Sequence, residues 1–191
     1  MHFSSSGFSP TVEDQWELTT LRVHEWVQDE LFSVGWWLLL ALFLLNVYLS
    51  WKIADKKRLG ETALFTAVVV ICIIVLDELG EELVLWYYPV DIIPLFPPAS
   101  AVDVSCLPFV YGLLFRIAKP WKRFLAVLAV MSVVSCFVLE PIFVWANLYR
   151  KLDWKSWYGL PIYFAIGVVS KFIVQIAYRP VKKALRDAAL E

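Results

Sequence analysis

The sequence has little charge and lacks the short motifs that identify many enzymes. Only 18% of its 191 residues are Asp, Glu, Lys or Arg, and the net charge is −1. Without a basic surplus, the chain is not expected to bind nucleic acid. It also contains no HExxH sequence, no phosphate-binding loop and no recognisable nucleophile motif. An enzymatic role is therefore left open but is not the favoured interpretation.

Cysteine is also scarce. The three thiols, Cys72, Cys106 and Cys136, lie inside apolar runs, with no CxxC pair and no Cys/His metal spacing. A thiol in an apolar helix usually packs as a small hydrophobic group. The sequence therefore predicts neither a disulfide framework nor a zinc site.

Apolar and aromatic residues dominate the chain. It is 60% hydrophobic, with ten Trp and eight Tyr, and its mean hydropathy is +0.67. Soluble domains are about 45–50% apolar, and Trp and Tyr favour the membrane–water boundary. The composition predicts an all-α, polytopic integral membrane protein whose immediate partner is the lipid bilayer.

Five apolar runs are long enough, at about 18 residues or more, to be read as transmembrane helices. They cover residues 34–51, 62 into the acidic stretch 77–82, 100–118, 124–149 and 157–178. The predicted organisation is an extracytoplasmic segment (1–32) containing an amphipathic interfacial helix, a five-helix transmembrane domain (33–178) and a cytoplasmic tail (179–191).

The distribution of Lys and Arg predicts the orientation of these spans. With five spans, twelve of these residues fall on the side of the C-terminus and four on the side of the N-terminus. Because short cytoplasmic loops are enriched in Lys and Arg, we expect the N-terminus outside and the C-terminus in the cytoplasm. The predicted location is the cytoplasmic (cell) membrane.

The stretch LDELGEELVLWYYP, residues 76–89, places four acids directly after an apolar run. Counted at about 1.5 Å per residue, Asp77 and Glu140 lie about 22 and 24 Å above the cytoplasmic ends of their helices. Asp103 lies within the first turn of the next span, counted from the outside. Acids from three helices are thus expected in one outer layer, where they would form a cation or proton site. The candidate residues are Asp77, Glu78, Glu81, Asp103 and Glu140.

Such a site would suit a divalent cation as cofactor, because Ca²⁺, Mg²⁺ and Mn²⁺ prefer oxygen ligands; Asp77, Glu81 and Glu140 would be its ligands. Carboxylates in spans also relay protons. The alternative is that the span ends near Leu76 and the acids form a solvated cap. The apolar stretch LVLWYY after the acids favours a helix that continues for another turn or two.

Two further polar positions allow two interpretations each. Lys171 lies about 10 Å from the inner end of its helix, so its amine either extends to the surface or is paired inside the protein. Glu140-Pro141 is either a helix kink with a solvated acid or part of the shared site.

Residues from about 62 to 175 resemble a largely uncharacterised family of small multi-span membrane proteins of Bacillus-like spore-forming bacteria. The resemblance rests on short motifs: Tyr88-Pro89, Pro94, Asp103, Leu107-Pro108, Glu140, Tyr149 and Trp154-Lys155. It implies a bacterial cytoplasmic membrane, a link to sporulation, and a functional end in the outer acidic and aromatic layer.

Three functions remain compatible with the sequence. The first is a partner or scaffold subunit that binds a membrane protein, or a second copy of itself, through its outer aromatic and acidic face. The second is a cation- or proton-binding transporter or channel-like protein. The third is an intramembrane enzyme at the outer face, where clustered carboxylates would do acid–base work.

Overall fold

The structure, a computed structural model, describes residues 9–53, 58–94 and 106–187. Its α-helices are α1 (Pro10–Glu25), α2 (Val34–Ile53), α3 (Leu59–Glu82), α4 (Leu107–Ile117), α5 (Trp121–Val134), α6 (Glu140–Trp145) and α7 (Gly159–Asp187). The remaining elements are the π-helices η1 (Trp26–Glu30) and η4 (Ser135–Leu139), the 3-10 helix η5 (Ser156–Tyr158), and the strands β1 (Trp86–Tyr87) and β2 (Arg150–Lys151). The all-α class is confirmed, with one short strand pair added.

Within these described residues, four helical stretches are long and apolar enough to cross a membrane. They are Val34–Ile53, Leu59–Glu82, Trp121–Trp145 and Ser156–Pro180, and they correspond to four of the five predicted spans. The helix α7 also continues beyond Tyr178 to Asp187. The predicted tail therefore begins as a continuation of the last span.

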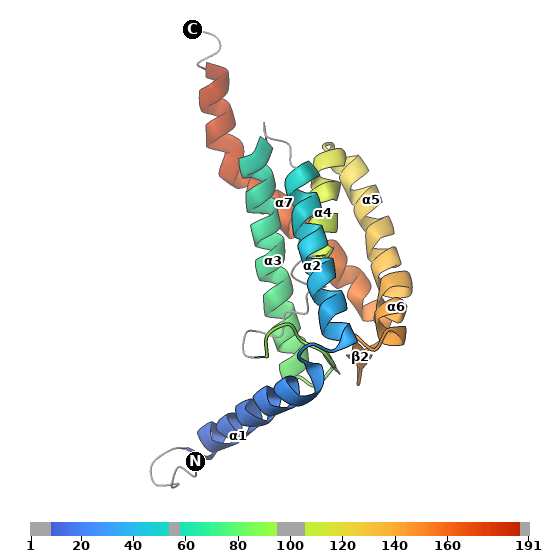
Figure 1. Cartoon of the computed structure of the whole chain (residues 1–191). Coiled ribbons are helices and arrows are strands. Elements are labelled where there is room, and N and C mark those ends of the chain that lie inside the picture. The colour runs from blue at the N-terminus through green and yellow to red at the C-terminus, as the bar shows by residue number, and fades with distance from the viewer. Residues whose placement is uncertain (1–8, 54–57, 95–105, 188–191) are drawn as a thin grey trace.

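The predicted third span is represented only by α4. Residues 100–105 lie outside the described ranges, and the 11 residues of α4 are too few to span a bilayer alone. Even so, α4 lies within the bundle, and its C-terminal end is beside the start of α5 (Figure 1). The strands β1 and β2 lie at the opposite end. The strand β1 and the start of α5 therefore lie at opposite ends of the bundle.

The core lies where α3, α4, α5 and α7 meet. Phe65, Tyr111, Phe124 and Leu128 are fully buried there, and the Tyr111 hydroxyl donates a 2.6 Å hydrogen bond to a backbone carbonyl of α7. A side chain at Gly167 would overlap Leu128, so this glycine allows α7 to approach α5 closely. The core fixes the helices that form the wall of the site described below.

The helix that contains Glu140 is interrupted by the π-turn η4. Pro141 has no N–H and would clash with the carbonyl four residues earlier in a regular α-helix. The π-turn η4 lies just before Pro141 and accommodates the missing hydrogen bond and the bulk of the proline ring. Glu140 follows the π-turn as the first residue of α6 and is only 6% exposed. The interpretation of Glu140 as a solvated acid at a kink is therefore wrong.

The helices α3 and α6 end in similar turns. Val84 and Asn147 adopt left-handed backbone conformations, with φ of 55° in both. The following N–H groups of Leu85 and Leu148 then donate back to carbonyls of the last helical turn. The prediction that the apolar stretch after the acids continues the helix is wrong, because the chain turns sharply at Val84.

The two reversed segments then pair as β1 and β2. Trp86 lies opposite Lys151, and Tyr87 lies opposite Arg150, in an antiparallel arrangement. The carbonyl of Leu85 also accepts hydrogen bonds from the backbone of the segment after β2. This pairing ties the end of α3 to the end of α6.

Lys171 is buried and does not extend to the surface. It is 2% exposed, and its amine donates hydrogen bonds of 3.1 Å to the carbonyls of Ala118 and Lys119, where α4 ends. The same nitrogen lies 4.9 Å from the centre of the Trp121 ring and 4.0 Å from that of Phe124. Of the two interpretations, the internal pairing applies, and Lys171 caps α4.

The N-terminal segment leaves the bundle at the end that carries the strands, and α1 extends away at an angle (Figure 1). In the described residues, the hydrogen bonds that join this segment to the segment after β1 come from η1 and the start of α2. The Trp26 indole donates to the Asp91 carbonyl at 2.8 Å, and the Asp91 N–H donates to Glu30 at 2.8 Å. The Trp36 indole donates to the carbonyl of Ile92 at 3.3 Å.

The attachment at Glu30 is expected to weaken as pH rises. Burial raises the pKa of Glu30 above its ordinary 4.5, opposed by the hydrogen bond from Asp91 and reinforced by repulsion from Glu25 and Asp29. The folded state therefore holds this proton more tightly, and its stabilising effect, complete below about pH 4.5, is lost as pH rises through the raised pKa. In Glu30→Gln this dependence should disappear.

Amide hydrogen exchange at Asp91 checks this prediction. The ratio of the exchange rate in the unmodified protein to that in Glu30→Gln, taken at each pH, should rise with pH because the intrinsic pH dependence cancels. Glu17→Gln, on the exposed face of α1, is the matched control and should leave the profile unchanged. A constant ratio across the pH range would contradict the role given to Glu30.

Candidate functional site: an apolar cavity with an acidic and aromatic end

A cavity of about 690 Å³ lies inside the bundle, between α2, α3, α4, the α5–η4–α6 helix and α7. Most of its wall is aliphatic, including Leu42, Ile73, Val110, Met131 and Ile162. Its volume falls within the range of about 300–1,000 Å³ typical of ligand pockets. The cavity is therefore large enough for a small molecule and mostly suited to an apolar one.

Two carboxylates interrupt this apolar wall. Asp77 on α3 and Glu140 on α6 are the only acidic side chains among the described lining residues, and no Lys, Arg or His lines the cavity in that part of the chain. They come from helices whose ends are joined by the β1–β2 pair. One end of the cavity thus contains both acidic side chains of the described wall.

Glu140 is held by contacts from the loop after β2. Its Oε1 accepts a 3.0 Å hydrogen bond from the Trp154 indole. Its Oε2 is buried and has no hydrogen-bond partner in the described structure, with the amine of Lys151 3.8 Å away. That amine instead donates to Ser156 at 2.9 Å. One buried oxygen of Glu140 therefore retains the capacity to accept a hydrogen bond.

Asp77 is half-buried and is oriented by a tyrosine. The Tyr88 hydroxyl donates to Asp77 Oδ1 at 2.9 Å, and the Tyr88 ring packs near Tyr149, with 5.5 Å between ring centres. Tyr88 follows β1 and Tyr149 precedes β2. The strand pair thus positions the groups that hold both carboxylates.

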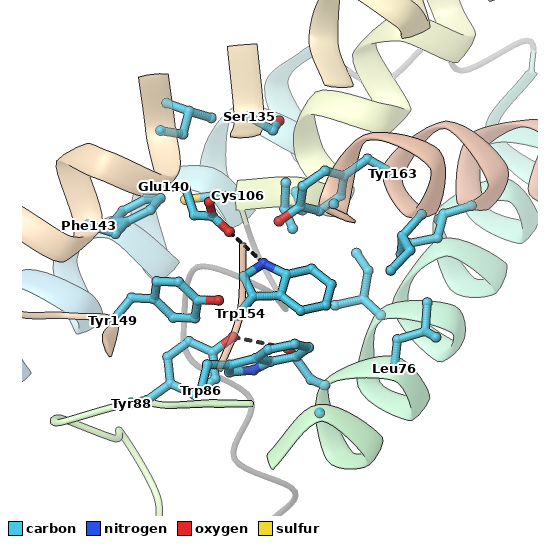
Figure 2. A pocket seen from close by; sticks show the side chains of 18 of the residues that line it. Leu76, Trp86, Tyr88, Cys106, Ser135, Glu140, Phe143, Tyr149, Trp154 and Tyr163 are labelled. Atoms are coloured by element: carbon cyan, nitrogen blue, oxygen red, sulfur yellow. Dashed lines mark hydrogen bonds between the residues drawn. The ribbon is translucent and has the colours of Figure 1, made fainter. Parts of the chain in front are cut away.

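Aromatic rings close this end of the cavity. The rings of Trp86 and Trp154 meet edge to face with centres 4.7 Å apart, and Figure 2 shows Trp154 with its indole N–H toward Glu140 and Trp86 beneath it. Trp86 packs directly on Gly80, where any side chain would overlap its ring. A glycine at this position of α3 is therefore required for the tryptophan to fold back over the helix.

The structure brings together two of the five predicted carboxylates. Asp77 and Glu140 line the same cavity, whereas Glu78 is exposed and Glu81, half-buried, is not part of the wall. Asp103 lies outside the described residues. Within the described ranges, no group of three or more His, Cys, Asp and Glu side chains could hold a metal ion. The predicted divalent-cation site with Asp77, Glu81 and Glu140 as ligands therefore gains no support.

The sequence predicted an outer acidic and aromatic layer, but it did not reveal the contact between Trp86 and Trp154. Trp86 and Trp154 are 68 residues apart in the sequence, and only the β1–β2 pairing brings them together. One sequence pattern could have indicated this contact. Each of the two tryptophans follows the end of an apolar run that contains an acid late in the run.

Three buried polar atoms of the cavity wall lack a hydrogen-bond partner in the described structure. They are Glu140 Oε2, Trp86 Nε1 and Ser135 Oγ. Buried polar groups are normally hydrogen-bonded, so each such group requires an explanation. A ligand that carries polar atoms at one end of an apolar body would satisfy them.

Comparison with protein-family models, with curated proteins and with solved structures found no match for this chain. The resemblance to a membrane-protein family of spore-forming bacteria stays a prediction. The function is therefore argued from the cavity and the residues around it.

Proposed function

We propose that this protein is an integral membrane binding protein that holds an amphiphilic, lipid-like molecule inside its helical bundle. The observation that carries the proposal is the cavity of about 690 Å³, which is apolar along most of its wall. A purely apolar ligand would leave Glu140 Oε2, Trp86 Nε1 and Ser135 Oγ without hydrogen bonds. An amphiphile satisfies both parts of the wall at once.

The proposed ligand lies with its alkyl chain along the inside of the helices. Along α3 the wall runs from Ile73 to Gly80, about 10 Å at 1.5 Å per residue. The polar headgroup would occupy the end formed by Asp77, Glu140 and Trp154. A single-chain amphiphile fits this shape better than a bulky, two-chain lipid.

The proposed setting follows the predicted topology. Five crossings, with the N-terminus outside, agree with strands at one end of the bundle and the α4–α5 connection at the other (Figure 1). The helix α1 would then lie along the outer membrane surface, and the acidic end of the cavity would face the outer leaflet. We propose the cytoplasmic membrane of a spore-forming bacterium as the location.

Filling the cavity is expected to abolish ligand binding. Val110 lines the wall and is half-buried, so Val110→Trp should occupy the space of the alkyl chain. Thermal unfolding of the detergent-solubilised protein measures the effect, with a long-chain alcohol or a long-chain alkylamine as the probe. At about 100 times its dissociation constant, a bound probe should raise Tm by about 5–10 °C.

The matched control is Val130→Trp, because Val130 is 63% exposed on the outer face of α5. The unmodified protein and Val130→Trp should both be stabilised by a probe, and Val110→Trp should not. If neither probe stabilises the unmodified protein, or if Val110→Trp responds equally, the proposal is wrong.

A second candidate is the role of partner or scaffold subunit. It is favoured by large exposed aromatic residues near the strand-bearing end, where Trp145 is 87% and Trp157 is 56% exposed. The helix α1 has no buried residues and could contact a membrane protein or a second copy of the chain. Cross-linking at Trp145 and Trp157 positions in native membranes, with recovery of one discrete partner, would favour this role over ligand binding.

The cation- or proton-binding alternative depends on Asp77 and Glu140 alone. Two carboxylates are few for a divalent cation, which prefers six or more oxygen ligands, but they are sufficient to carry a proton. No described contact adds to the hypothesis of an intramembrane enzyme. Both therefore rank below amphiphile binding.

A further inference from the structure

We infer that the headgroup of the bound amphiphile is a cation, either an amine or a quaternary ammonium. This inference rests on the proposed function and adds the chemical class of the ligand. It is carried by the acidic side chains of the cavity wall, by the buried Glu140 oxygen and by the aromatic rings around it.

Charge complementarity is the first argument. Asp77 and Glu140 each line the cavity, and no basic side chain lines it within the described residues. Lys151 lies 3.8 Å from Glu140 Oε2 but outside the wall, and its amine donates a hydrogen bond to Ser156. A wall that contains carboxyl groups and, within the described residues, no basic side chain complements a cationic headgroup better than an anionic one.

The second argument is the unsatisfied oxygen of Glu140. The carboxylate is 6% exposed, and its Oε2 has no hydrogen-bond partner among the described residues. Its other oxygen already accepts from Trp154, which holds the group in place. An ammonium in the cavity would provide the charge-assisted hydrogen bond that Oε2 lacks, in addition to its longer contact with Lys151.

The third argument is the aromatic surround. Trp86, Tyr88, Tyr149 and Trp154 all line the acidic end of the cavity. Ring faces attract cations, and aromatic rings combined with carboxylates recognise quaternary ammonium groups. The same chain already holds a buried ammonium in this way, since Lys171 lies 4.0 Å from the centre of the Phe124 ring and 4.9 Å from that of Trp121.

A neutral headgroup satisfies these observations less well. A hydroxyl would donate one hydrogen bond to Glu140 Oε2, but without the charge assistance that an ammonium provides. The cationic headgroup is therefore expected to bind more tightly than the neutral one for the same alkyl chain.

A headgroup series with one chain length tests the inference. Binding of a tritiated long-chain alkylamine to the purified full-length protein is measured and then competed with the alkyltrimethylammonium, alcohol and sulfonate of the same chain. The amine and the trimethylammonium should bind at least about tenfold more tightly than the alcohol. The sulfonate should compete weakest of all.

Glu140→Gln removes the charge and keeps an oxygen that can accept from Trp154. It should reduce the preference for amine over alcohol at least about tenfold, with little change in the affinity of the alcohol. Asp153→Asn is the matched control, because Asp153 is exposed near the same end and does not line the cavity. It should keep the full preference for the amine.

The outcomes separate this inference from the proposed function. Equal affinities for amine and alcohol, both lost in Val110→Trp, would overturn the cationic headgroup and leave amphiphile binding standing. A preference for the amine that survives in Glu140→Gln would also overturn it. If no member of the series binds, the cavity does not hold an amphiphile, and both proposals fail.

Discussion

Replacing Trp154 with alanine is expected to lower the free energy of unfolding by about 3 kcal/mol, which is typical of losing a large aromatic side chain from a packed site. The substitution removes the edge-to-face contacts with Trp86 and Tyr158, whose ring centres lie 4.7 and 5.6 Å away. It also removes the hydrogen bond to Glu140 Oε1, so that neither oxygen of this buried carboxyl group would accept a hydrogen bond from the described residues. Unfolding of the detergent-solubilised protein in denaturant measures the loss.

Two variants assign this effect to its causes. Trp154→Phe keeps a ring but not the indole N–H, so it should cost about 1–3 kcal/mol. Trp145→Ala is the matched control, because Trp145 is 87% exposed and its loss should change stability by less than about 0.5 kcal/mol. Equal effects of the alanine substitutions at 145 and 154 would show that Trp154 does not organise the acidic end.

Replacing Lys171 with methionine is expected to cost about 2 kcal/mol. The substitution keeps the volume of the side chain but frees the carbonyls of Ala118 and Lys119, each of which accepts a charged hydrogen bond typically worth about 1.5–3 kcal/mol. Removing a buried charge offsets part of this loss. The thermal unfolding temperature should fall, and hydrogen exchange at the C-terminal end of α4 should increase.

The control for Lys171 is Lys52→Met at the exposed end of α2, where the amine lies 5.7 Å from the Tyr48 ring. Its effect should stay within about 0.5 kcal/mol. If Lys171→Met is as stable as the unmodified protein, the buried amine contributes nothing to the position of α4. The contacts of Lys171 with the Trp121 and Phe124 rings would then no longer support the argument that aromatic rings bind a cation in the cavity.

The membrane-spanning helices were the most predictable part of the fold. Long apolar runs have few alternatives to helices that satisfy their own backbone hydrogen bonds in a membrane, so Val34–Ile53 and Trp121–Trp145 follow from composition alone. The end of α3 did not. The apolar stretch after Glu82 was expected to extend the helix, but the left-handed turn at Val84 depends on pairing with a strand that lies more than 60 residues later.

The candidate site was predictable only in part for a similar reason. Helical spacing suggested that Asp77 and Glu81 share a face of α3, but only Asp77 lines the cavity. Glu81 lies in the last turn, close to where the chain reverses. Glu140 was identified as a candidate because it is an acid late in an apolar run, whereas its aromatic partner Trp154 is set by tertiary contacts.

Lys171 illustrates how local rules can mislead. A lysine about 10 Å from a helix end commonly extends its amine to the surface. Here the end of α4 offers two carbonyls, and the rings of Trp121 and Phe124 provide a favourable surround. Both come from other helices, so no pattern within α7 could indicate them.

The central claim is that an amphiphile occupies the interior of the bundle, and photochemical labelling tests it most directly. A long-chain alkylamine with a diazirine midway along its chain is irradiated with the purified protein, and the labelled residues are mapped by mass spectrometry. The account predicts saturable labelling of wall residues such as Leu76, Val110 and Ile162, lost in Val110→Trp. Labelling confined to outward-facing positions such as Val130 and Phe137 would contradict it, because the probe would then lie only in the surrounding detergent or lipid.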